Sequence, residues 1–427
     1  MESTALLTDQ YELTMLRAAL RAGTAHRQCV FEAFARRLPD GRRYGVVSGT
    51  GRLLEAIEAF RFDVDDLAFL LDAHIIDPDT RDWLADYRFA GDVDGYAEGE
   101  LYFPGSPVLT VRGSFAQAVL LETIVLSILN HDCAVASAAA RMVVAAGDRP
   151  LIEMGSRRTH ERAAVAAARA AFIAGFAATS NLEAGRRYGV PTTGTAAHSF
   201  TLLDDESNAF RAQVDTLGAG TTLLVDTYDI AEGIRRAVEV AGPGLGAIRI
   251  DSGDLGGLAK EARRQLDSLG ATKTHIVVTS DLDEYSIAAL AAAPVDSYGV
   301  GTTLVTGSGA PTAGMVYKLV EVDGRPVAKR SEHKSSRGGR KVAVRRHKAS
   351  GTATEEVIRA QADPSEQPGD RPLQMPLMRG GRPVDRLPTL AQARETMRAR
   401  MVSVPWDGTK LSRGEPAIPT TFEGGPR

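Results

Sequence analysis

Residues 247–254 read AIRIDSGD, an apolar run that carries Arg249 and ends abruptly at Asp251. Apolar runs bounded by turn residues are typical of buried strands. In α/β proteins, ligands bind at the carboxyl ends of such strands. A second strand end of this kind, with two glycines, follows at residues 297–303. The two ends predict a sugar-phosphate site, in which carboxylates bind hydroxyls and glycine amides face phosphate oxygens.

The overall composition is that of an ordinary soluble protein. The chain has 427 residues, which favours two domains. Its net charge of -4 predicts neither nucleic acid nor a membrane as a partner. Cys29 and Cys133 are the only cysteines, too few for a disulfide framework or a cysteine-built zinc site. Residues 1–13 lack the basic start and apolar core of a secretory signal, and residues 163–178 fall short of a membrane span. We therefore expect a cytoplasmic protein.

Short apolar runs alternate with helix-like stretches from about residue 150 onward. Repeated βα units at this spacing imply a parallel sheet, and eight of them predict an irregular (β/α) barrel. An open doubly wound sheet is the alternative. No GxGxxG follows the first strand, which argues against a dinucleotide site. The expected strands are residues 151–155, 176–180, 192–199, 221–227, 247–251, 275–281, 297–301 and 315–322.

The two ends of the chain have a different character. Residues 91–114 are rich in Gly and Pro with short β-like pieces, which indicates antiparallel strands. We expect an N-terminal segment, 1–140, to join a C-terminal segment, 325–427, in a second, smaller α+β domain. The barrel would then span 141–324.

Polar residues gather after the expected strands. Each could be a helix N-cap, and that explanation fits about half of Asp and Ser residues in such places. In a barrel, however, all strand carboxyl ends line one mouth, so the whole set predicts one pocket. The set comprises Arg157, Arg158, Ser180, Asn181, His198, Ser199, Asp226, Asp229, Asp251, Asp281 and Asp283.

His198 lies in GTAAHSF, among small residues that leave room for a ligand. A lone histidine is more often a packed or surface residue. Here its imidazole could act as a base, or as a nucleophile that accepts a phosphoryl group. A metal site is a poor interpretation because no second histidine lies at ligand spacing.

The segment 329–348 holds nine Lys or Arg in twenty residues. A nucleic-acid tail is one interpretation, but interleaved aromatic residues are missing. A solvated loop is a second, and a basic flap near a polyphosphate substrate is a third.

An ordered set of motifs makes the chain similar to one known family. Their order, from near the N-terminus to about residue 345, is that of the nicotinate phosphoribosyltransferases. The motifs are TDQYELTM from Thr8, EGELYFPGSPVLTVRG from Glu98, EMGSRR from Glu153, GTAAHSF from Gly194, VDTYD from Val225, IRIDSGDL from Ile248, TSDLDE from Thr279 and GVGTTLVT from Gly299.

This resemblance implies an activity in NAD salvage. Nicotinate and phosphoribosyl pyrophosphate would give nicotinate mononucleotide and pyrophosphate, with coupled hydrolysis of ATP. It also implies an irregular α/β barrel with a smaller domain, and a homodimer with active sites near the subunit interface. In relatives the histidine that matches His198 is phosphorylated by ATP.

The resemblance also implies roles for individual residues. Tyr11 matches an aromatic that stacks on the pyridine ring across the dimer interface, and Thr195 matches a nicotinate contact. Arg157 matches an arginine near the pyridine carboxylate, and Arg158 a phosphate contact. The phosphoribosyl substrate would be bound through Arg249 and Thr302, with Gly301 beside them, while Asp251 would bind ribose hydroxyls and Asp226 and Asp251 would hold Mg²⁺. The remaining expected substrate-binding residues are Ser180, Ser199, Ser252, Gly253, Asp281 and Gly299.

Two positions depart from relatives. Nicotinamide-using relatives carry an aspartate where this chain has Ser180, which lacks a fixed charge to repel a carboxylate. That difference favours nicotinate. Met154 stands where relatives often carry an aromatic that helps to sandwich the ring.

Three alternatives to this function remain at this point. One is a nicotinamide-specific enzyme, and a second is a transferase of the same fold that does not use ATP. The third is a non-catalytic protein whose basic segment binds nucleic acid.

Overall fold

The computed structural model describes residues 3–329, 337–360 and 369–423. The chain divides into two compact units, of which the first joins Met1–Ser137 to Ala310–Arg427 and the second is Ala138–Gly309. The unit built from the two ends of the chain contains more residues than the other, although the sequence led us to expect it to be the smaller. Residues 310–324, expected in the barrel, belong to this first unit.

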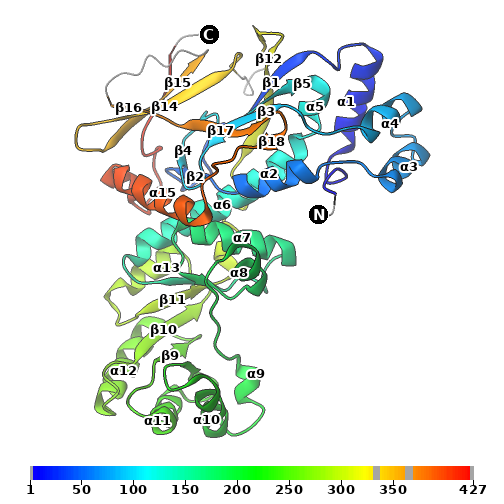
Figure 1. The fold of residues 1–427 in the computed structure, drawn as a ribbon. Helices are drawn as coiled ribbons and strands as arrows, with labels where there is room; N and C mark the ends of the chain where they lie inside the picture. Colours follow the sequence, from blue (N-terminus) through cyan, green and yellow to red (C-terminus); the bar gives the residue numbers. More distant parts are fainter. Residues whose placement is uncertain (1–2, 330–336, 361–368, 424–427) are drawn as a thin grey trace. The chain divides into compact units, whose positions relative to one another are not determined.

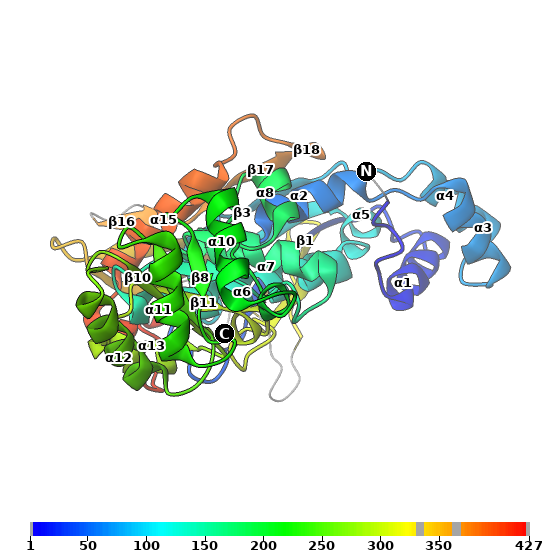
Figure 2. The same ribbon diagram turned by 90° about the horizontal axis from the view of Figure 1, so that it is seen from below.

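The second unit is built on a six-stranded parallel sheet in the order β7-β6-β11-β10-β9-β8 (Figure 1). Its helices include α10, α11 and α12, which lie side by side in both ribbon views (Figure 2). The strands are β6 Leu151–Glu153, β7 Ala178–Thr179, β8 Thr222–Leu224, β9 Ala247–Ile250, β10 His275–Ser280 and β11 Ser297–Val300. The helices are α7 Glu161–Ala174, α8 Leu182–Tyr188, α9 His198–Thr201, α10 Glu206–Leu217, α11 Ile230–Ala241, α12 Leu255–Ser268, α13 Glu284–Ala289, the 3₁₀ turn η1 Leu290–Ala292 and α14 Thr302–Val305.

The parallel sheet confirms the α/β class, but it forms half a barrel because two of the eight expected strands are not in it. Residues 192–199 make only an isolated bridge, between Thr192 and Thr179. Residues 315–322 form β12 (Met315–Val322), which pairs antiparallel with β1 (Gln28–Ala35) in the first unit. The burial of β12 alternates along much of its length, as expected for a strand with one covered face.

Parallel register brings the strand ends of the second unit to one edge. Ile250 pairs with Val278, and Ser280 pairs with Val300. The residues that follow these strands therefore emerge together. The expected clustering of polar strand ends is thus a consequence of the sheet itself.

The first unit contains a seven-stranded sheet in the order β13-β12-β1-β5-β3-β17-β18 (Figure 1). β1 lies between β12 and β5, both antiparallel to it. The other strands of this sheet are β3 Asp92–Tyr96, β5 Leu109–Ser114, β13 Arg325–Pro326, β17 Gln374–Arg379 and β18 Arg382–Pro383. A separate two-stranded sheet consists of β2 Gly45–Val46 and β4 Leu101–Tyr102. The helices are α1 Gln10–Arg21, α2 Thr50–Ala59, α3 Val64–Asp72, α4 Pro78–Ala85, α5 Phe115–Val119, α6 Glu122–Ala146, which runs on past Ser137, α15 Leu390–Ser403 and the 3₁₀ turn η2 Trp406–Thr409.

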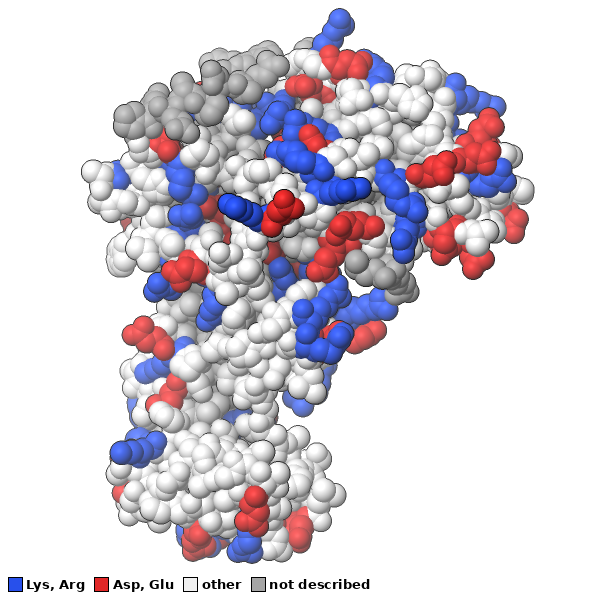
Figure 3. Space-filling model, in the orientation of Figure 1, with Lys and Arg blue, Asp and Glu red and all other residues white. Residues whose placement is uncertain are grey.

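Two cations of the basic segment, Lys341 and Arg345, are buried in the structure, whereas Lys329, Arg337 and Lys348 are exposed. The residues of this segment after 336 lead into β14 (Lys341–His347), which belongs to a four-stranded sheet with β15 Ala353–Ala360, β16 Asp370–Pro372 and β19 Thr420–Glu423. Lys341 pairs with buried Glu32 at 2.7 Å, and Arg345 pairs with Glu100 at 2.6 Å. These cations are buried in ion pairs rather than displayed in a loop or flap; residues 330–336 lie outside the described part of the chain. On the face shown in Figure 3, basic and acidic side chains are interspersed.

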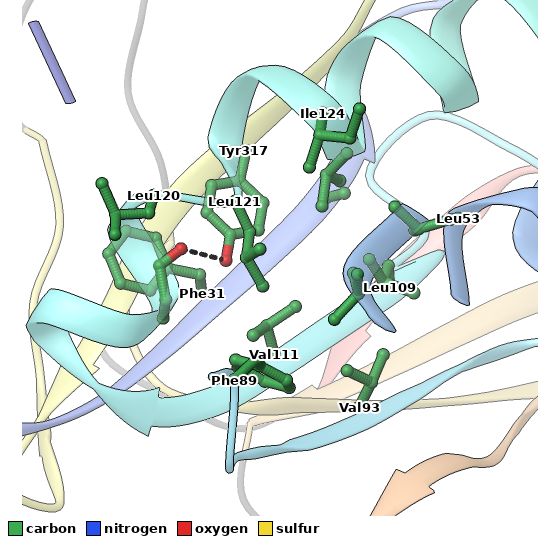
Figure 4. Close-up of a cluster of buried hydrophobic side chains, with 14 of the residues drawn as sticks. Phe31, Leu53, Phe89, Val93, Leu109, Val111, Leu120, Leu121, Ile124 and Tyr317 are labelled. Carbon is green, nitrogen blue, oxygen red and sulfur yellow. Dashed lines mark hydrogen bonds between the residues drawn. The ribbon is translucent and has the colours of Figure 1, made fainter. Parts of the chain in front are cut away.

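The core of the first unit lies between its sheet and the α5–α6 region (Figure 4). Phe31 of β1 stacks on Tyr317 of β12, with ring centroids 4.9 Å apart. The hydroxyl of Tyr317 donates to the carbonyl of Ala118 at 3.0 Å. The helical stretch 115–146, which comprises α5 and α6, is long and apolar enough to cross a membrane, yet 67% of its apolar 18-residue window is buried inside the structure. Its apolar character is therefore explained by core packing.

Candidate active site

A cavity of about 570 Å³ opens at the carboxyl edge of the parallel sheet. All of its lining residues come from the second unit. Many of the expected site residues line it, namely Arg157, Arg158, Ser180, Thr195, Arg249, Asp251, Asp281, Gly299, Gly301 and Thr302.

Asp226 ties the ends of β8 and β9 together. Its Oδ2 atom accepts hydrogen bonds from the backbone amide of Asp251 at 2.7 Å and from the hydroxyl of Ser252 at 3.1 Å. The Asp226 side chain is 1% exposed, and its Oδ1 atom has no hydrogen-bond partner. A buried carboxylate oxygen without a partner is costly and indicates a ligand-binding role.

The imidazole of His198 lies beside both carboxylates. Its Nδ1 atom is 3.1 Å from the hydroxyl of Thr227. Its Nε2 atom is 3.7 Å from Oδ2 of Asp251 and 3.9 Å from Oδ1 of Asp226. The Thr227 hydroxyl is hydrogen-bonded to Nδ1, and Nε2 faces the carboxylates of Asp226 and Asp251. This arrangement leaves Nε2 available for chemistry while the ring orientation is fixed.

Arg249 is one of three arginines that line the cavity. It projects from β9, and its Nη1 atom donates to the hydroxyl of Thr195 at 2.6 Å. Its Nη2 atom is 4.0 Å from Oδ2 of Asp251. Burial lowers the pKa of Arg249, but a guanidinium remains charged. The result is a positioned cation next to an acid, as a phosphorylated sugar requires.

The two glycines that flank Val300 have different roles. Gly299 lies within β11, and a Cβ there would lie 2.5 Å from Cγ2 of Thr279 and 2.7 Å from Sδ of Met154. Close packing therefore requires glycine at position 299, which also lines the cavity. Gly301 precedes α14, where the hydroxyl of Thr302 donates to Oδ1 of Asp281 at 3.3 Å.

Some expected residues lie elsewhere. Ser199, Ser252 and Gly253 are exposed and do not line the cavity, although Ser252 contacts Asp226. His198 and Asp226 are not in the cavity lining either, but they lie next to Asp251, which is. Asp229 and Asp283 do not line the cavity and instead cap α11 and α13. Tyr11 lies in α1 of the first unit and is 45% exposed. Burial, followed by the nearby Glu122 carboxylate, raises the pKa of Tyr11 to about 12.

Sequence reasoning missed several hydroxyl and amide groups. Thr227 stands between the two acids of VDTYD, where its position beside His198 could not be seen. Thr279 donates to Oδ1 of Asp251 at 2.6 Å. Ser156 also lines the cavity and accepts a hydrogen bond from the side chain of Asn181 at 3.0 Å. All of these residues lie at the end of a strand or within three residues after it, and this position is the one feature of the sequence that could have identified them.

The residues around the cavity fit Mg²⁺ only when a substrate completes the site. In the described ranges, no group of three or more His, Cys, Asp or Glu side chains could hold a metal by itself. Asp226 and Asp251 nevertheless offer two neighbouring carboxylates, one with the unpartnered Oδ1 atom. Mg²⁺ is commonly bound by one or two carboxylates together with substrate phosphates and water.

Two family models match the chain. The nicotinate phosphoribosyltransferase N-terminal domain matches residues 6–130, and the nicotinate phosphoribosyltransferase family matches residues 150–361.

The chain belongs to the nicotinate phosphoribosyltransferase family.

Relatives within the nicotinate phosphoribosyltransferase family match over nearly the full length. Nicotinate phosphoribosyltransferase pncB1 of Mycobacterium tuberculosis is 67% identical over 97% of this chain and 94% of its own. Nicotinate phosphoribosyltransferase pncB2 of the same species is 42% identical over 94% of this chain and 88% of its own. The crystal structure of human nicotinic acid phosphoribosyltransferase superposes with a TM-score of 0.84 at 26% identity, covering 97% of each chain.

Proposed function

We propose that the chain transfers the phosphoribosyl group of phosphoribosyl pyrophosphate to the ring nitrogen of nicotinate, giving nicotinate mononucleotide and pyrophosphate in NAD salvage. We propose further that ATP is hydrolysed in the same cycle through a phosphohistidine at His198. Family membership supports the transfer reaction. The observation that carries the coupled mechanism is the position of His198 Nε2, 3.7 Å from Asp251 beside the cavity.

The transfer requires stabilisation of the positive charge that develops on the ribose ring in the transition state. As the bond from the anomeric carbon to pyrophosphate breaks, the sugar becomes oxocarbenium-like. The carboxylates of Asp226 and Asp251 stabilise that charge, and Asp251 can accept from ribose hydroxyls through Oδ2. Arg249 offsets the charge of the phosphate groups. Nicotinate needs no base, because its ring nitrogen already has a lone pair.

His198 would accept a phosphoryl group from ATP. Because Thr227 engages Nδ1, we assign the attack to Nε2. That nitrogen forms a bond to the γ-phosphorus as the bond to ADP breaks, and the imidazole proton passes to solvent. Water later hydrolyses the phosphohistidine to phosphate. Mg²⁺ held by Asp226 and Asp251 with the substrate would neutralise pyrophosphate charge as it leaves.

The cavity wall favours a carboxylated base. Arg157 supplies a cation and Ser180 a neutral hydroxyl, and both line the cavity. An aspartate at position 180 would repel nicotinate, whereas serine does not. This observation supports nicotinate over nicotinamide as the preferred base.

Family membership also supports a proposal for the assembly and the cellular location. We propose a cytoplasmic homodimer in which Tyr11 stacks on the base across the interface. The mixed surface charge in Figure 3 and the buried pairs of the basic segment argue against nucleic acid as the partner. The burial of the apolar stretch 115–146 argues against a membrane.

One assay separates these functions. The protein is incubated with Mg²⁺, phosphoribosyl pyrophosphate and either nicotinate or nicotinamide, with and without ATP, and products are measured by mass spectrometry. We expect nicotinate mononucleotide as the main product, with ADP formed in the same reaction. His198→Ala should abolish ADP formation. Absence of nicotinate mononucleotide would refute the proposal, and unchanged ADP formation in His198→Ala would refute the phosphohistidine.

A further inference from the structure

A buried carboxyl group without a cationic partner lies directly before one of the segments that line the cavity. Glu153 ends β6, and both it and Thr179 of β7 are 0% exposed. The groups that contact its side chain are hydrogen-bond donors: the backbone amide of Gly155 donates to Oε1, and the hydroxyl of Thr179 donates to Oε2. No described Lys or Arg forms an ion pair with Glu153. A buried acid held in this way indicates a positioning role.

The hydrogen bonds continue from Thr179 to the cavity-lining segment that follows β7 and back to the segment that follows β6. The hydroxyl of Thr179 accepts from the backbone amide of Asn181 at 2.9 Å. The side chain of Asn181 in turn donates to the hydroxyl of Ser156 at 3.0 Å and caps α8 by accepting from the amide of Ala184 at 2.9 Å. A continuous path of hydrogen bonds therefore runs from Glu153 through Thr179 and Asn181 to Ser156.

This path joins the two segments that follow β6 and β7. The first carries Ser156, Arg157 and Arg158, and the second carries Ser180; all four line the cavity. The backbone amide of Ser180 also donates to the carbonyl of Glu153 at 2.8 Å. The separation of Arg157 from Ser180 is thus set by groups that do not themselves line the cavity.

We propose that Glu153, Thr179 and Asn181 are positioning residues that fix the spacing of the base-binding walls and so determine affinity for nicotinate. The inference rests on the proposed function, which places the base between Arg157 and Ser180. A site held rigid before binding loses less entropy when the ligand enters. Loosening the path should therefore weaken nicotinate binding. The binding of phosphoribosyl pyrophosphate should change less, since most of its expected contacts come from β9 and α14 and only Arg158 lies on the segment that follows β6.

Thr179→Val removes the shared hydroxyl while keeping the size of the side chain. Thr179→Ser restores the hydroxyl, and Thr216→Val is a matched control because its hydroxyl lies on the exposed face of α10, donating to the carbonyl of Ala212. In the full chain, we expect Thr179→Val to raise KM for nicotinate about tenfold. KM for phosphoribosyl pyrophosphate should stay within about twofold of wild type. Thr179→Ser should recover most of the loss.

The KM values distinguish positioning from damage to the fold. A partly unfolded variant has fewer active molecules, which lowers apparent kcat and leaves KM unchanged. Equal changes in both KM values, or no change in Thr179→Val, would overturn the proposal.

Hydrogen exchange tests the path without relying on the reaction. The amides of Gly155 and Asn181 should exchange slowly in wild type and Thr179→Ser, and at least tenfold faster in Thr179→Val. Unchanged exchange would overturn the positioning role even if the enzyme acts on another base. Failure of wild type to form nicotinate mononucleotide, with exchange as expected, would refute the proposed function and the link to nicotinate while leaving the path itself intact.

Discussion

Oδ2 of Asp226 accepts a hydrogen bond from the backbone amide of Asp251 at 2.7 Å. The Asp226 carboxylate therefore has two roles. Its Oδ2 atom joins the ends of β8 and β9, while its Oδ1 atom has no hydrogen-bond partner and lies near His198. Charge and geometry at this position can be separated by substitution.

Asp226→Asn should lower turnover by about 100-fold or more, because the charge facing His198 is lost. Its unfolding temperature should remain close to wild type, since the amide oxygen can still accept from Asp251. Asp226→Ala leaves that amide without its acceptor and should cost a further 1–3 kcal/mol or so of stability. Steady-state kinetics and thermal unfolding of both variants check this. Equal stability of the two variants would contradict the strand-joining role.

Thr227→Val should slow phosphorylation of His198 by about tenfold, because the ring loses the hydroxyl that orients Nδ1. Thr227→Ser is the matched control and should stay near the wild-type rate. The measurement is the rate of ADP release in single-turnover experiments with ATP. Identical rates in the valine and serine variants would show that the contact is incidental.

Gly299→Ala should destabilise the protein by about 1–3 kcal/mol, because the new methyl would overlap Thr279 and Met154. Gly220→Ala is a suitable control, since nothing lies within 4 Å of a Cβ at that position. Denaturant unfolding compares the two. If Gly299→Ala is as stable as the control, close packing does not explain this glycine.

Stability should fall as pH rises from about 5 to 8 through a contribution from Glu12. Burial raises the pKa of Glu12 from 4.5 to about 7. The folded state therefore holds a proton that the unfolded state releases above about pH 4.5, so the contribution is present at low pH and lost as pH rises through 7. Glu12→Gln should remove this dependence.

The free energy of unfolding, measured at pH 5 and pH 8, checks the Glu12 prediction. Relative to wild type, Glu12→Gln should gain about 2 kcal/mol between these values, after allowance for partial screening by water. A constant difference between the two proteins would contradict it.

The parallel sheet was predictable because its strands are apolar on both faces and end in polar groups. Asp226, Arg249 and Asp251 were found for that reason. β12 was misplaced because its alternating pattern marks an antiparallel strand, but its partner β1 lies almost 300 residues away along the chain. Residues 192–199 did not form a sheet strand, since their small residues offer little apolar surface to bury.

The hydrogen-bond partners were harder to predict. Thr179, Thr227 and Thr279 look alike in the sequence, and only the folded sheet shows which one meets Glu153, His198 or Asp251. The pairing of Lys341 with Glu32 likewise depends on contacts between distant segments. Basic residues in a run indicated solvent or a polyanion, whereas tertiary structure gives some of them buried partners.

The placement of β1 between β5 and β12 has a consequence for synthesis on the ribosome. After residue 114 emerges, β1 can pair on one side only, and its other edge waits for residues 315–322. At ordinary translation speeds this wait is on the order of tens of seconds. Meanwhile Ala138–Gly309 emerges as one uninterrupted unit and can fold first. Nascent chains in which Gly309 has left the ribosome but residues 315–322 have not would therefore carry a finished second unit together with an open strand edge, which makes them substrates for chaperones.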